Sequence, residues 1–433
     1  MKKLALVCQR NAKLPFIFEA AQAANIELVM IYDTAESAPT QLPAAVTSTW
    51  QLPVFDKPEE ALETFAMGAK ERNIAGVMPL REEAILWTAL AAKKINTPSI
   101  EPEVAALTRN KYLMRQAFAK ASLRTPKFLY IDNPEDLSQI HALDYPLVIK
   151  PVSGWASTGV MLAKNSAELP DLIKAVWNVQ HKDMARFYDK NKPIGLIVEQ
   201  YLPGKEFVVE CFVDTAGVHV LAVGDKGQPE GPWFEETIYR QRCDIDDPLI
   251  IALCEVACSG VKALGINMGA AHVELRLGVH NLPYIIEIGA RIGGSGVSHF
   301  IVEQGTGVSF AKLCMKVALA EQTPDLPDVL PAKKVAANYI IPLHGYGHFC
   351  GFSGLEKVAL HPQTARTIIF FEPDHISPPP PAFGGYPGFI FSVHASDQEA
   401  RDYHKWLDNI LSIRWKHHVD QKPNQDISTQ PQL

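Results

Sequence analysis

The chain has 433 residues, of which 47% are hydrophobic, and a formal net charge of −7. A chain of this length can bury a large core and should divide into two to four units, of which we expect three. The mild acidic excess and the lack of a long Lys/Arg block argue against nucleic-acid binding, so we expect small-molecule partners.

Composition also bears on the cellular compartment. The apolar run that starts at Leu4 is interrupted at Gln9, which is too early for a signal-peptide core, and no stretch reaches membrane-spanning length. Seven cysteines, an odd number without a C-x-x-C pair, fit reduced thiols better than a disulfide framework. We therefore expect a cytoplasmic protein without a membrane partner.

The first 100 residues alternate strands with helices. The predicted strands are 4–8, 26–32 and 74–80, and the predicted helices are 14–25, 58–73 and 81–96. Alternation of this kind is typical of a parallel α/β sheet. Because no G-x-G-x-x-G fingerprint follows the first strand, we predict a Rossmann-like domain over 1–100 that does not bind a dinucleotide.

From residue 101 to residue 330 the pattern favours an α+β unit, in which helices and antiparallel strands are mixed. The predicted helices are 102–107 and 110–122, and the predicted strands are 146–151, 195–202, 206–214 and 218–225, followed by a hairpin around the loop 278–283. A smaller sheet domain is expected over 331–418. The polar, Pro- and Gln-rich tail at 419–433 is typical of a disordered segment.

Two glutamates in the hairpin suggest a metal site. The loop 278–283 centres between His280 and Asn281, so a symmetric hairpin places Glu274 opposite Glu287. Two like charges that face each other destabilise a bare hairpin, and one would stay protonated unless a positive charge lies between them. A divalent cation is the simplest such charge.

An arginine and two glycines follow this pair. Arg291 comes four residues after Glu287, so it can lie near a metal-bound phosphate without ligating the metal. Arginine keeps its charge and suits phosphate or carboxylate geometry. Gly293 and Gly294 allow backbone amides to approach a substrate closely. The alternative is a surface arginine followed by an ordinary loop.

A lysine and a loop of small residues form a second candidate site. Lys150 ends an apolar strand of the buried type and needs an anion there. The loop that follows offers N–H groups and hydroxyls to phosphate oxygens through Ser153, Gly154, Ser157, Thr158 and Gly159. It is not a Walker A loop, whose pattern occurs nowhere in the chain. A glycine-containing hairpin with a solvated lysine is the alternative.

Two further carboxylates flank a turn. Glu199 lies near the end of the strand 195–202, and Glu206 begins the strand 206–214. Glu199 suits an adenine amino group, and Glu206 can accept hydrogen bonds from two ribose hydroxyls. An ordinary strand–turn–strand with exposed glutamates is the alternative reading.

In this order, seven charged residues resemble the motif set of the ATP-grasp superfamily of carboxylate–amine ligases: Lys111, Lys150, Glu199, Glu206, Glu274, Glu287 and Arg291. The resemblance covers most of the chain, and the matched segments are RNKYLMRQAF, PLVIKPVSGWASTGV, VEQYLPGKEFVVE, HVELRL and IIEIGARIGG. It implies an ATP-grasp fold with an N-terminal pre-ATP-grasp domain, a central ATP-grasp domain and a C-terminal domain that completes the active site.

The resemblance also implies ATP as the nucleotide. Lys111 and Lys150 resemble the two lysines that hold its phosphates, and the segment 153–159 resembles the loop that covers them. Glu206 would hold the ribose. Adenine would be recognised by Glu199 together with the backbone of Tyr201 and Leu202.

For the metal, the resemblance implies Mg²⁺, with Mn²⁺ as the alternative, held by Glu274 and Glu287. Arg291 would stabilise the transferring phosphoryl group and the acyl phosphate. Many members carry asparagine where this chain has Gly289, so one ligand or hydrogen bond is missing or comes from elsewhere. The small residue and the three-part layout are most similar to the L-amino acid ligases, which make dipeptides.

The implied reaction activates one carboxylate with ATP as an acyl phosphate, which an amine then attacks, releasing ADP and phosphate. Two alternatives stay open, namely a ligase or carboxylase for another metabolic acid and a non-catalytic ATP-binding module. Relatives are often dimers, so the resemblance also admits a homodimer.

One loop and one histidine lead to further expectations. We predict that the loop 224–242, with Trp233 and Glu235, lines or closes over the amino-acid site, an ordinary surface loop being the alternative. For His272 we expect a core or surface position, on the argument that strand neighbours point opposite ways and so turn it away from Glu274.

Overall fold

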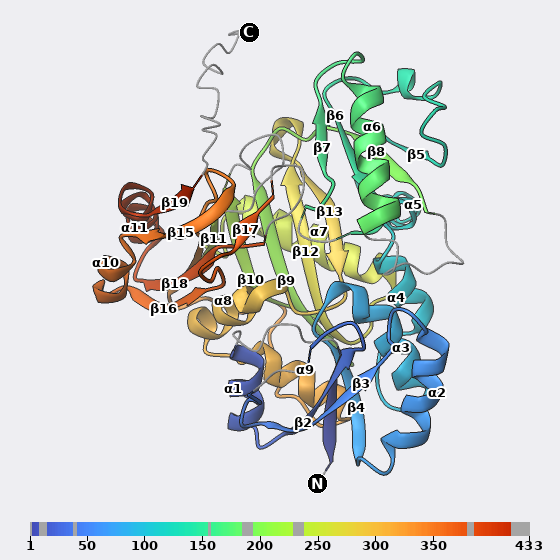
Figure 1. Ribbon diagram of the computed structural model, residues 1–433, viewed down its shortest axis with the longest axis vertical. Coiled ribbons are helices and arrows are strands. Elements are labelled where there is room, and N and C mark those ends of the chain that lie inside the picture. The colour runs from blue at the N-terminus through green and yellow to red at the C-terminus, as the bar shows by residue number, and fades with distance from the viewer. Residues whose placement is uncertain are drawn as a thin grey trace.

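The computed structural model describes residues 2–7, 15–37, 41–154, 157–183, 194–227, 238–378 and 385–416. Within these ranges the strands form four sheets, which Figure 1 shows as a central body with smaller lobes around it. The mixed α/β and α+β class predicted from the sequence is confirmed. The predicted tail at 419–433 lies outside the described residues.

The N-terminal lobe is a parallel four-stranded sheet in the order β3-β2-β1-β4. Its strands are β1 (Lys3–Val7), β2 (Glu27–Asp33), β3 (Val46–Leu52) and β4 (Ile74–Pro79), and its helices are α1 (Phe16–Ala23), α2 (Pro58–Ala69), η1 (Glu82–Ala84) and α3 (Ile85–Lys94). The sequence missed β3, because this edge strand buries only its two ends and its polar interior lacks an apolar face.

Helices α4 (Pro102–Thr108) and α5 (Lys111–Lys120) lead into a second, antiparallel sheet in the order β5-β8-β6-β7. Its elements are β5 (Phe128–Ile131), β6 (Leu147–Pro151), β7 (Met161–Ala163), α6 (Leu169–Asn178) and β8 (Leu196–Gln200). This sheet has its own apolar core, formed mainly with α6, and stands beside the central body in Figure 1. It positions Lys150 and Glu199.

The central sheet has eight strands in the order β13-β12-β9-β10-β11-β14-β18-β16. They are β9 (Glu206–Asp214), β10 (Gly217–Gly227), β11 (Ile238–Gln241), β12 (Gly269–Leu277), β13 (Pro283–Gly289), β14 (Val335–Ile340), β16 (Thr364–Ile369) and β18 (Gly388–His394). Because β14, β16 and β18 come from beyond residue 330, the segment 331–418 shares this sheet with the unit before it. The domain limits stay a prediction.

Helices cover both faces of the central sheet. One apolar core lies under α7 (Pro248–Leu264), and another lies under α8 (Val297–Thr306) and α9 (Phe310–Ala318), where it also includes α1. The remaining C-terminal elements are β15 (Gly347–Ser353), α10 (Leu355–Leu360), β17 (Ile376–Ser377), α11 (Asp397–Ile410) and β19 (Ser412–Lys416), of which the strands form a small sheet in the order β17-β15-β19.

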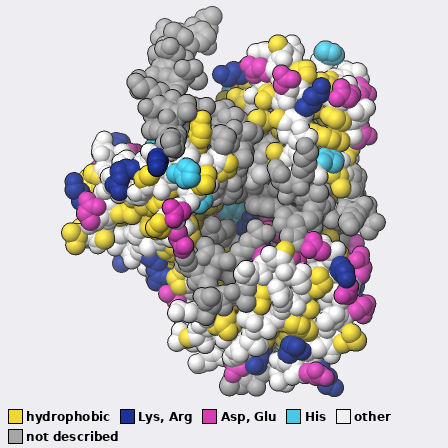
Figure 2. All heavy atoms as spheres, in the orientation of Figure 1, with side chains coloured by type: hydrophobic (Ala, Val, Ile, Leu, Met, Phe, Trp, Pro, Cys, Tyr) yellow, Lys and Arg dark blue, Asp and Glu magenta, His cyan; other side chains and the backbone are white. Residues whose placement is uncertain are grey.

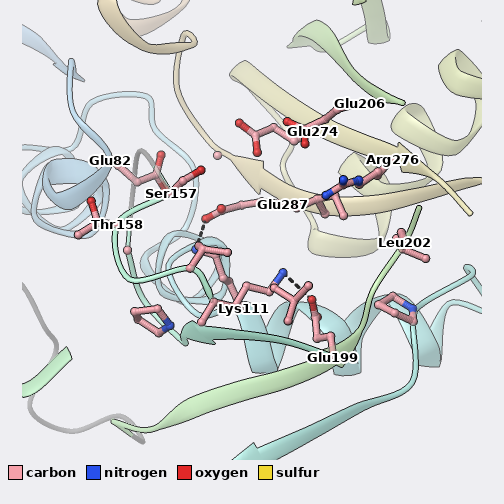
Figure 3. Close-up of a pocket in the computed structure, with 18 of the residues that line it drawn as sticks. Glu82, Lys111, Ser157, Thr158, Glu199, Leu202, Glu206, Glu274, Arg276 and Glu287 are labelled. Atoms are coloured by element: carbon pink, nitrogen blue, oxygen red, sulfur yellow. Dashed lines mark hydrogen bonds and ion pairs between the residues drawn. The ribbon is translucent and has the colours of Figure 1, made fainter. Parts of the chain in front are cut away.

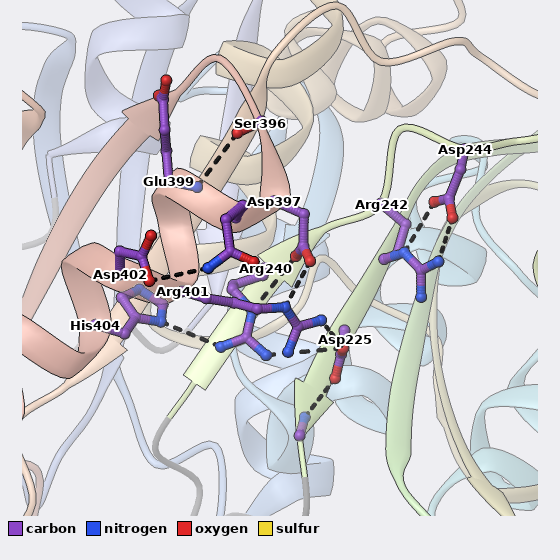
Figure 4. Close-up of polar contacts among 12 residues, drawn as sticks. Asp225, Arg240, Arg242, Asp244, Ser396, Asp397, Glu399, Arg401, Asp402 and His404 are labelled. Carbon is purple, nitrogen blue, oxygen red and sulfur yellow. Dashed lines mark hydrogen bonds and ion pairs between the residues drawn. The ribbon is translucent and has the colours of Figure 1, made fainter.

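A buried ion cluster docks α11 onto the central sheet (Figure 4). Asp225, which is 1% exposed near the end of β10, lies 3.7 Å from Arg240 Nη2 and 3.4 Å from Arg401 Nη2 through its Oδ2 atom. Arg401 Nε lies 2.6 Å from Oδ2 of Asp397 in the first turn of α11. The cluster therefore joins the C-terminal helix to both strands that flank residues 228–237.

Two further features are the distribution of charge on the surface and the apolar character of the helices. Acidic and basic side chains are interspersed over the face shown in Figure 2. Among the described residues, no helix combines the length and the apolar character needed to cross a bilayer.

Candidate active site

The predicted pairing of two glutamates is confirmed by the register of the hairpin between β12 and β13. Glu274 lies directly opposite Glu287. The symmetry assumed from the loop does not hold throughout, because Leu275 pairs with Ile285 and leaves Ile286 as a β-bulge. The bulge restores the register beyond it, so the two carboxylates still face each other.

Both glutamates line a cavity of about 1050 Å³, open solvent at its mouth included, and lie among cations (Figure 3). Lys111 Nζ lies 2.8 Å from Glu287 Oε1, and Lys226 Nζ lies 3.7 Å from Glu274 Oε1. Burial by itself raises the pKa of Glu274, but Lys226 and His272 outweigh burial and hold the pKa below its usual value. Glu274 is therefore ionised at neutral pH and offers oxygens to a divalent cation.

His272 lies beside this pair, and our expectation for it is wrong. Residues two apart on a strand share a face, so His272 and Glu274 point the same way, and Nε2 lies 3.4 Å from Oε1. On its other side Nδ1 lies 2.7 Å from Oε1 of Glu210, which is 0% exposed. Burial lowers the pKa of His272, yet Glu210 and Glu274 raise it to about 10.

Lys111 is positioned by the start of a helix. Asn110 caps α5 by accepting a hydrogen bond from the N–H of Leu113 at 3.0 Å, which fixes Lys111 as the first helical residue. The backbone N–H of Lys111 donates to the carbonyl of Val152 at 2.7 Å. Helix α5 is thereby attached to the start of the predicted phosphate loop.

Lys150 and Glu199 meet across the adjacent strands β6 and β8. Oε2 of Glu199 lies 2.5 Å from Lys150 Nζ, and Oε1 lies 2.5 Å from Arg115 Nε. Burial raises the pKa of Glu199, but Arg115 and Lys150 outweigh it and lower the pKa to about 2. Both oxygens are thus engaged by cations, so the predicted contact with adenine would use a further lone pair.

The predicted phosphate loop contributes to the cavity in part. Its cavity-lining members are Gly154, Ser157 and Thr158. The hydroxyl of Ser153 instead donates to the backbone carbonyl of Arg109. Gly159 has a φ of +74° after the turn at Ser157, a conformation that favours glycine. Ser153 and Gly159 therefore shape the loop, and Gly154, Ser157 and Thr158 face the cavity.

Of the residues expected to bind adenine and ribose, some line the cavity and one does not. Leu202 and Glu206 line the cavity, and Oε1 of Glu206 lies 2.6 Å from Lys226 Nζ. Tyr201 does not line it, and its backbone N–H donates to the carbonyl of Pro146 at 3.1 Å. The backbone N–H of Tyr201 is therefore already engaged.

Arg291 lines the same cavity and contacts a glutamate that the motifs did not include. Its Nε lies 2.5 Å from Oε2 of Glu82, whose Oε1 lies 3.0 Å from Arg109 Nη1. Burial lowers the pKa of Arg291, but Glu82, Glu274 and Glu287 together outweigh burial and raise it. A Cβ at Gly289 would lie 2.8 Å from Oε2 of Glu82. The space beside Gly289 is thus filled by a carboxylate from the N-terminal lobe.

The other predicted substrate-binding residues lie outside this cavity or outside the described residues. A Cβ at Gly293 would collide with Ser298 Oγ and His272 Nδ1, so close packing requires this glycine. A Cβ at Gly294 would meet open space. Gly293 lines a separate, smaller cavity. Trp233 and Glu235 lie outside the described residues, as do their neighbours in the segment 228–237.

Sequence reasoning missed six charged residues at or next to the cavity: Glu82, Arg109, Arg115, Glu210, Lys226 and Arg276. A charge on an apolar face was the available signal. Arg115 shares the buried face of α5 with Met114 and Phe118, and Glu210 lies in the middle of the apolar strand EFVVECFVD. A buried charge needs a partner, so either residue could have been assigned to the site.

Comparisons with known proteins agree with this arrangement. A model of the ATP-grasp N-terminal domain matches residues 18–99, and a model of the ATP-grasp domain matches residues 143–299. Among solved structures, an L-amino acid ligase from Bacillus licheniformis is similar, with 36% identity and a TM-score of 0.89. The match covers 96% of this chain and 99% of that one.

Two curated relatives are more distant. An alanine–anticapsin ligase of Bacillus subtilis (strain 168) is 25% identical over 316 residues, which are 68% of this chain and 65% of the relative. A D-alanine–D-alanine ligase of Bordetella petrii is 23% identical over 276 residues, which are 61% of this chain and 80% of the relative.

Proposed function

This chain belongs to the ATP-grasp superfamily of carboxylate–amine ligases, among its L-amino acid ligases, and on that premise we propose that it joins two L-amino acids. The carboxylate of one is activated by ATP as an acyl phosphate, the amine of the other attacks, and ADP and phosphate leave. The observation that carries the proposal is the similarity to the Bacillus licheniformis L-amino acid ligase over nearly the whole of both chains.

The nucleotide roles that we propose follow the charges of the cavity. Lys111 and Lys150 would hold the phosphates, and Gly154, Ser157 and Thr158 would cover them. Glu206 would hold the ribose, with Leu202 beside the adenine. Glu199 would act by keeping Lys150 charged and in place, because it pairs with that lysine at 2.5 Å.

The pair Glu274 and Glu287 fits Mg²⁺, with Mn²⁺ as the alternative. Two carboxylates opposite each other on neighbouring strands supply the hard oxygen ligands that Mg²⁺ takes, together with substrate phosphates. Lys111 and Lys226 contact these carboxylates in the structure, as expected of a site built for positive charge. A bound metal would neutralise the charge that develops on the transferring phosphoryl group.

The protein's own contribution to catalysis is positioning and electrostatic stabilisation. Arg291 would stabilise the phosphoryl group in transfer and then the acyl phosphate. Gly294, which has open space around it, would let a backbone amide approach the substrate. The predicted loop 224–242 is too long, because its ends overlap β10 and β11. The shorter segment between these strands, with Trp233 and Glu235, would shape the amino-acid pocket.

The test is nucleotide and phosphate release from the purified protein with Mg²⁺, ATP and pairs of L-amino acids, with products identified by mass spectrometry. We expect ADP, phosphate and the mass of a dipeptide. AMP and pyrophosphate would contradict the acyl-phosphate route. ADP release that depends on another carboxylic acid would shift the substrate class, and binding of ATP without turnover for any acceptor would indicate a non-catalytic module.

A further inference from the structure

Glu82 reaches the cavity from outside every motif that predicted the site. It lies in η1, between β4 and α3 of the N-terminal lobe, and is only 4% exposed. We propose that Glu82 is a positioning residue for Arg291: its carboxylate fills the space beside Gly289 and fixes the guanidinium that meets the phosphoryl group. The inference rests on the role proposed above for Arg291.

Two contacts hold the guanidinium of Arg291 in one orientation. Nε lies 2.5 Å from Oε2 of Glu82, and Nη1 donates to the carbonyl of Ile292 at 2.9 Å. A planar guanidinium held by such contacts can offer its remaining N–H groups to an anion without reorganising, which is the requirement for electrostatic stabilisation of a transition state.

Gly289 makes room for this arrangement. A Cβ at Gly289 would lie 2.8 Å from Oε2 and 3.7 Å from Oε1 of Glu82. The glycine lies in β13 and is not among the residues with positive φ, so its backbone conformation does not require glycine. The requirement at this position is therefore steric, and the group that needs the space is the Glu82 carboxylate.

A second arginine fixes the other oxygen of Glu82. Arg109 Nη1 lies 3.0 Å from Oε1 of Glu82. The backbone carbonyl of Arg109 accepts a hydrogen bond from the hydroxyl of Ser153 at the base of the phosphate loop. Glu82 thus stands between the loop expected to cover the phosphates and the arginine expected to stabilise their transfer. A misplacement of about 1 Å at such a point can cost about 10²-fold in rate.

Glu83 provides a matched control on the same helix. It is also buried, at 7% exposed, and it also pairs with an arginine, Arg81. It does not line the cavity. Glu83→Gln therefore reproduces the loss of a buried paired charge without removing the contact to Arg291.

The first experiment needs no amino-acid substrate. Binding of MgADP is measured with and without aluminium fluoride, which mimics the transferring phosphoryl group. We expect Glu82→Gln to weaken the aluminium fluoride complex by about tenfold or more and to change the Kd of MgADP alone by less than about twofold. Glu83→Gln should change neither. An unchanged aluminium fluoride affinity, or an equal loss for MgADP alone, would overturn the inference.

A double-mutant cycle tests the steric half of the inference. In the otherwise natural chain, Gly289→Ala should weaken the aluminium fluoride complex by about tenfold, because it displaces the carboxylate. In a Glu82→Ala background the same change should cost less than about twofold, because the space is free. Equal losses in both backgrounds would contradict the inference. Neither readout depends on the identity of the acceptor, so a failure here is distinct from a failure of the proposed ligase activity.

Discussion

Each described carboxylate that lines the cavity contacts a cation from another part of the chain. Glu199 pairs with Arg115 and Lys150, and Glu287 pairs with Lys111. Pairing of this kind keeps buried acids ionised and holds the cations where phosphates are expected. Breaking a buried pair by removing one partner costs about 3–5 kcal/mol, since an uncompensated charge is left inside.

The Glu199 pair predicts a specific response to pH. Its folded pKa of about 2 lies below the ordinary value of 4.5, so the stabilisation is fully present above about pH 4.5 and is lost as the pH falls toward 2. Glu199→Gln should lower the free energy of unfolding by about 3–5 kcal/mol at pH 7 and should flatten this acid dependence. Urea denaturation of the natural chain and the variant between pH 2 and pH 7 tests this prediction. If the two free energies of unfolding fall in parallel as the pH is lowered, the prediction is refuted.

At the scale of elements, two devices place the site. The β-bulge at Ile286 lets Glu274 and Glu287 face each other, and the freed carbonyl of Ile286 accepts a hydrogen bond from Arg115 at 2.8 Å. The second device is the ion cluster around Asp225, which joins α11 to the ends of β10 and β11. The hairpin thus lies at one edge of the central sheet, and the ion cluster lies at its middle strands.

Removal of Asp225 should weaken the attachment of α11 to the sheet. Asp225→Ala removes the buried carboxylate shared by Arg240 and Arg401 and leaves them with the half-exposed Asp397, so we expect a loss of about 3 kcal/mol in the free energy of unfolding. Lys93→Ala, which breaks the exposed pair with Glu101, is the control and should cost less than about 1 kcal/mol. Similar losses for the two variants would show that the cluster does not stabilise the fold.

At the scale of the molecule, the cavity is assembled from three lobes. Glu82 comes from the N-terminal lobe. Lys150 and Glu199 come from the antiparallel sheet β5-β8-β6-β7, and Glu274 and Glu287 come from the central sheet. A ligand that contacts all three should stabilise the whole protein, because it binds the folded state alone.

Thermal unfolding with nucleotide and metal tests this assembly. MgATP at about 100 times its Kd should add about 2.7 kcal/mol to the free energy of unfolding and raise Tm. ATP with a chelator should raise Tm less. The double variant Glu274→Gln with Glu287→Gln should lose the part of the Tm increase that depends on the metal and should keep the part that ATP gives without metal. If the chelator makes no difference in the natural chain, the metal site is wrong.

The sequence by itself determined the alternation of strands and helices in the N-terminal lobe and the order of the charged motifs. It also determined that Glu274 faces Glu287. Local periodicity and loop length set these features, and both can be read within about 25 residues. Strands with a polar interior, such as β3, gave no such local signal.

Tertiary structure alone decided how distant segments meet. The chain does not reveal that strands from beyond residue 330 complete the central sheet, since register across a sheet depends on packing between elements far apart in sequence. Nor does it reveal that Glu82 fills the space beside Gly289, more than 200 positions away. A buried charge signals in the sequence that it needs a partner, but only the folded chain decides which partner is within reach.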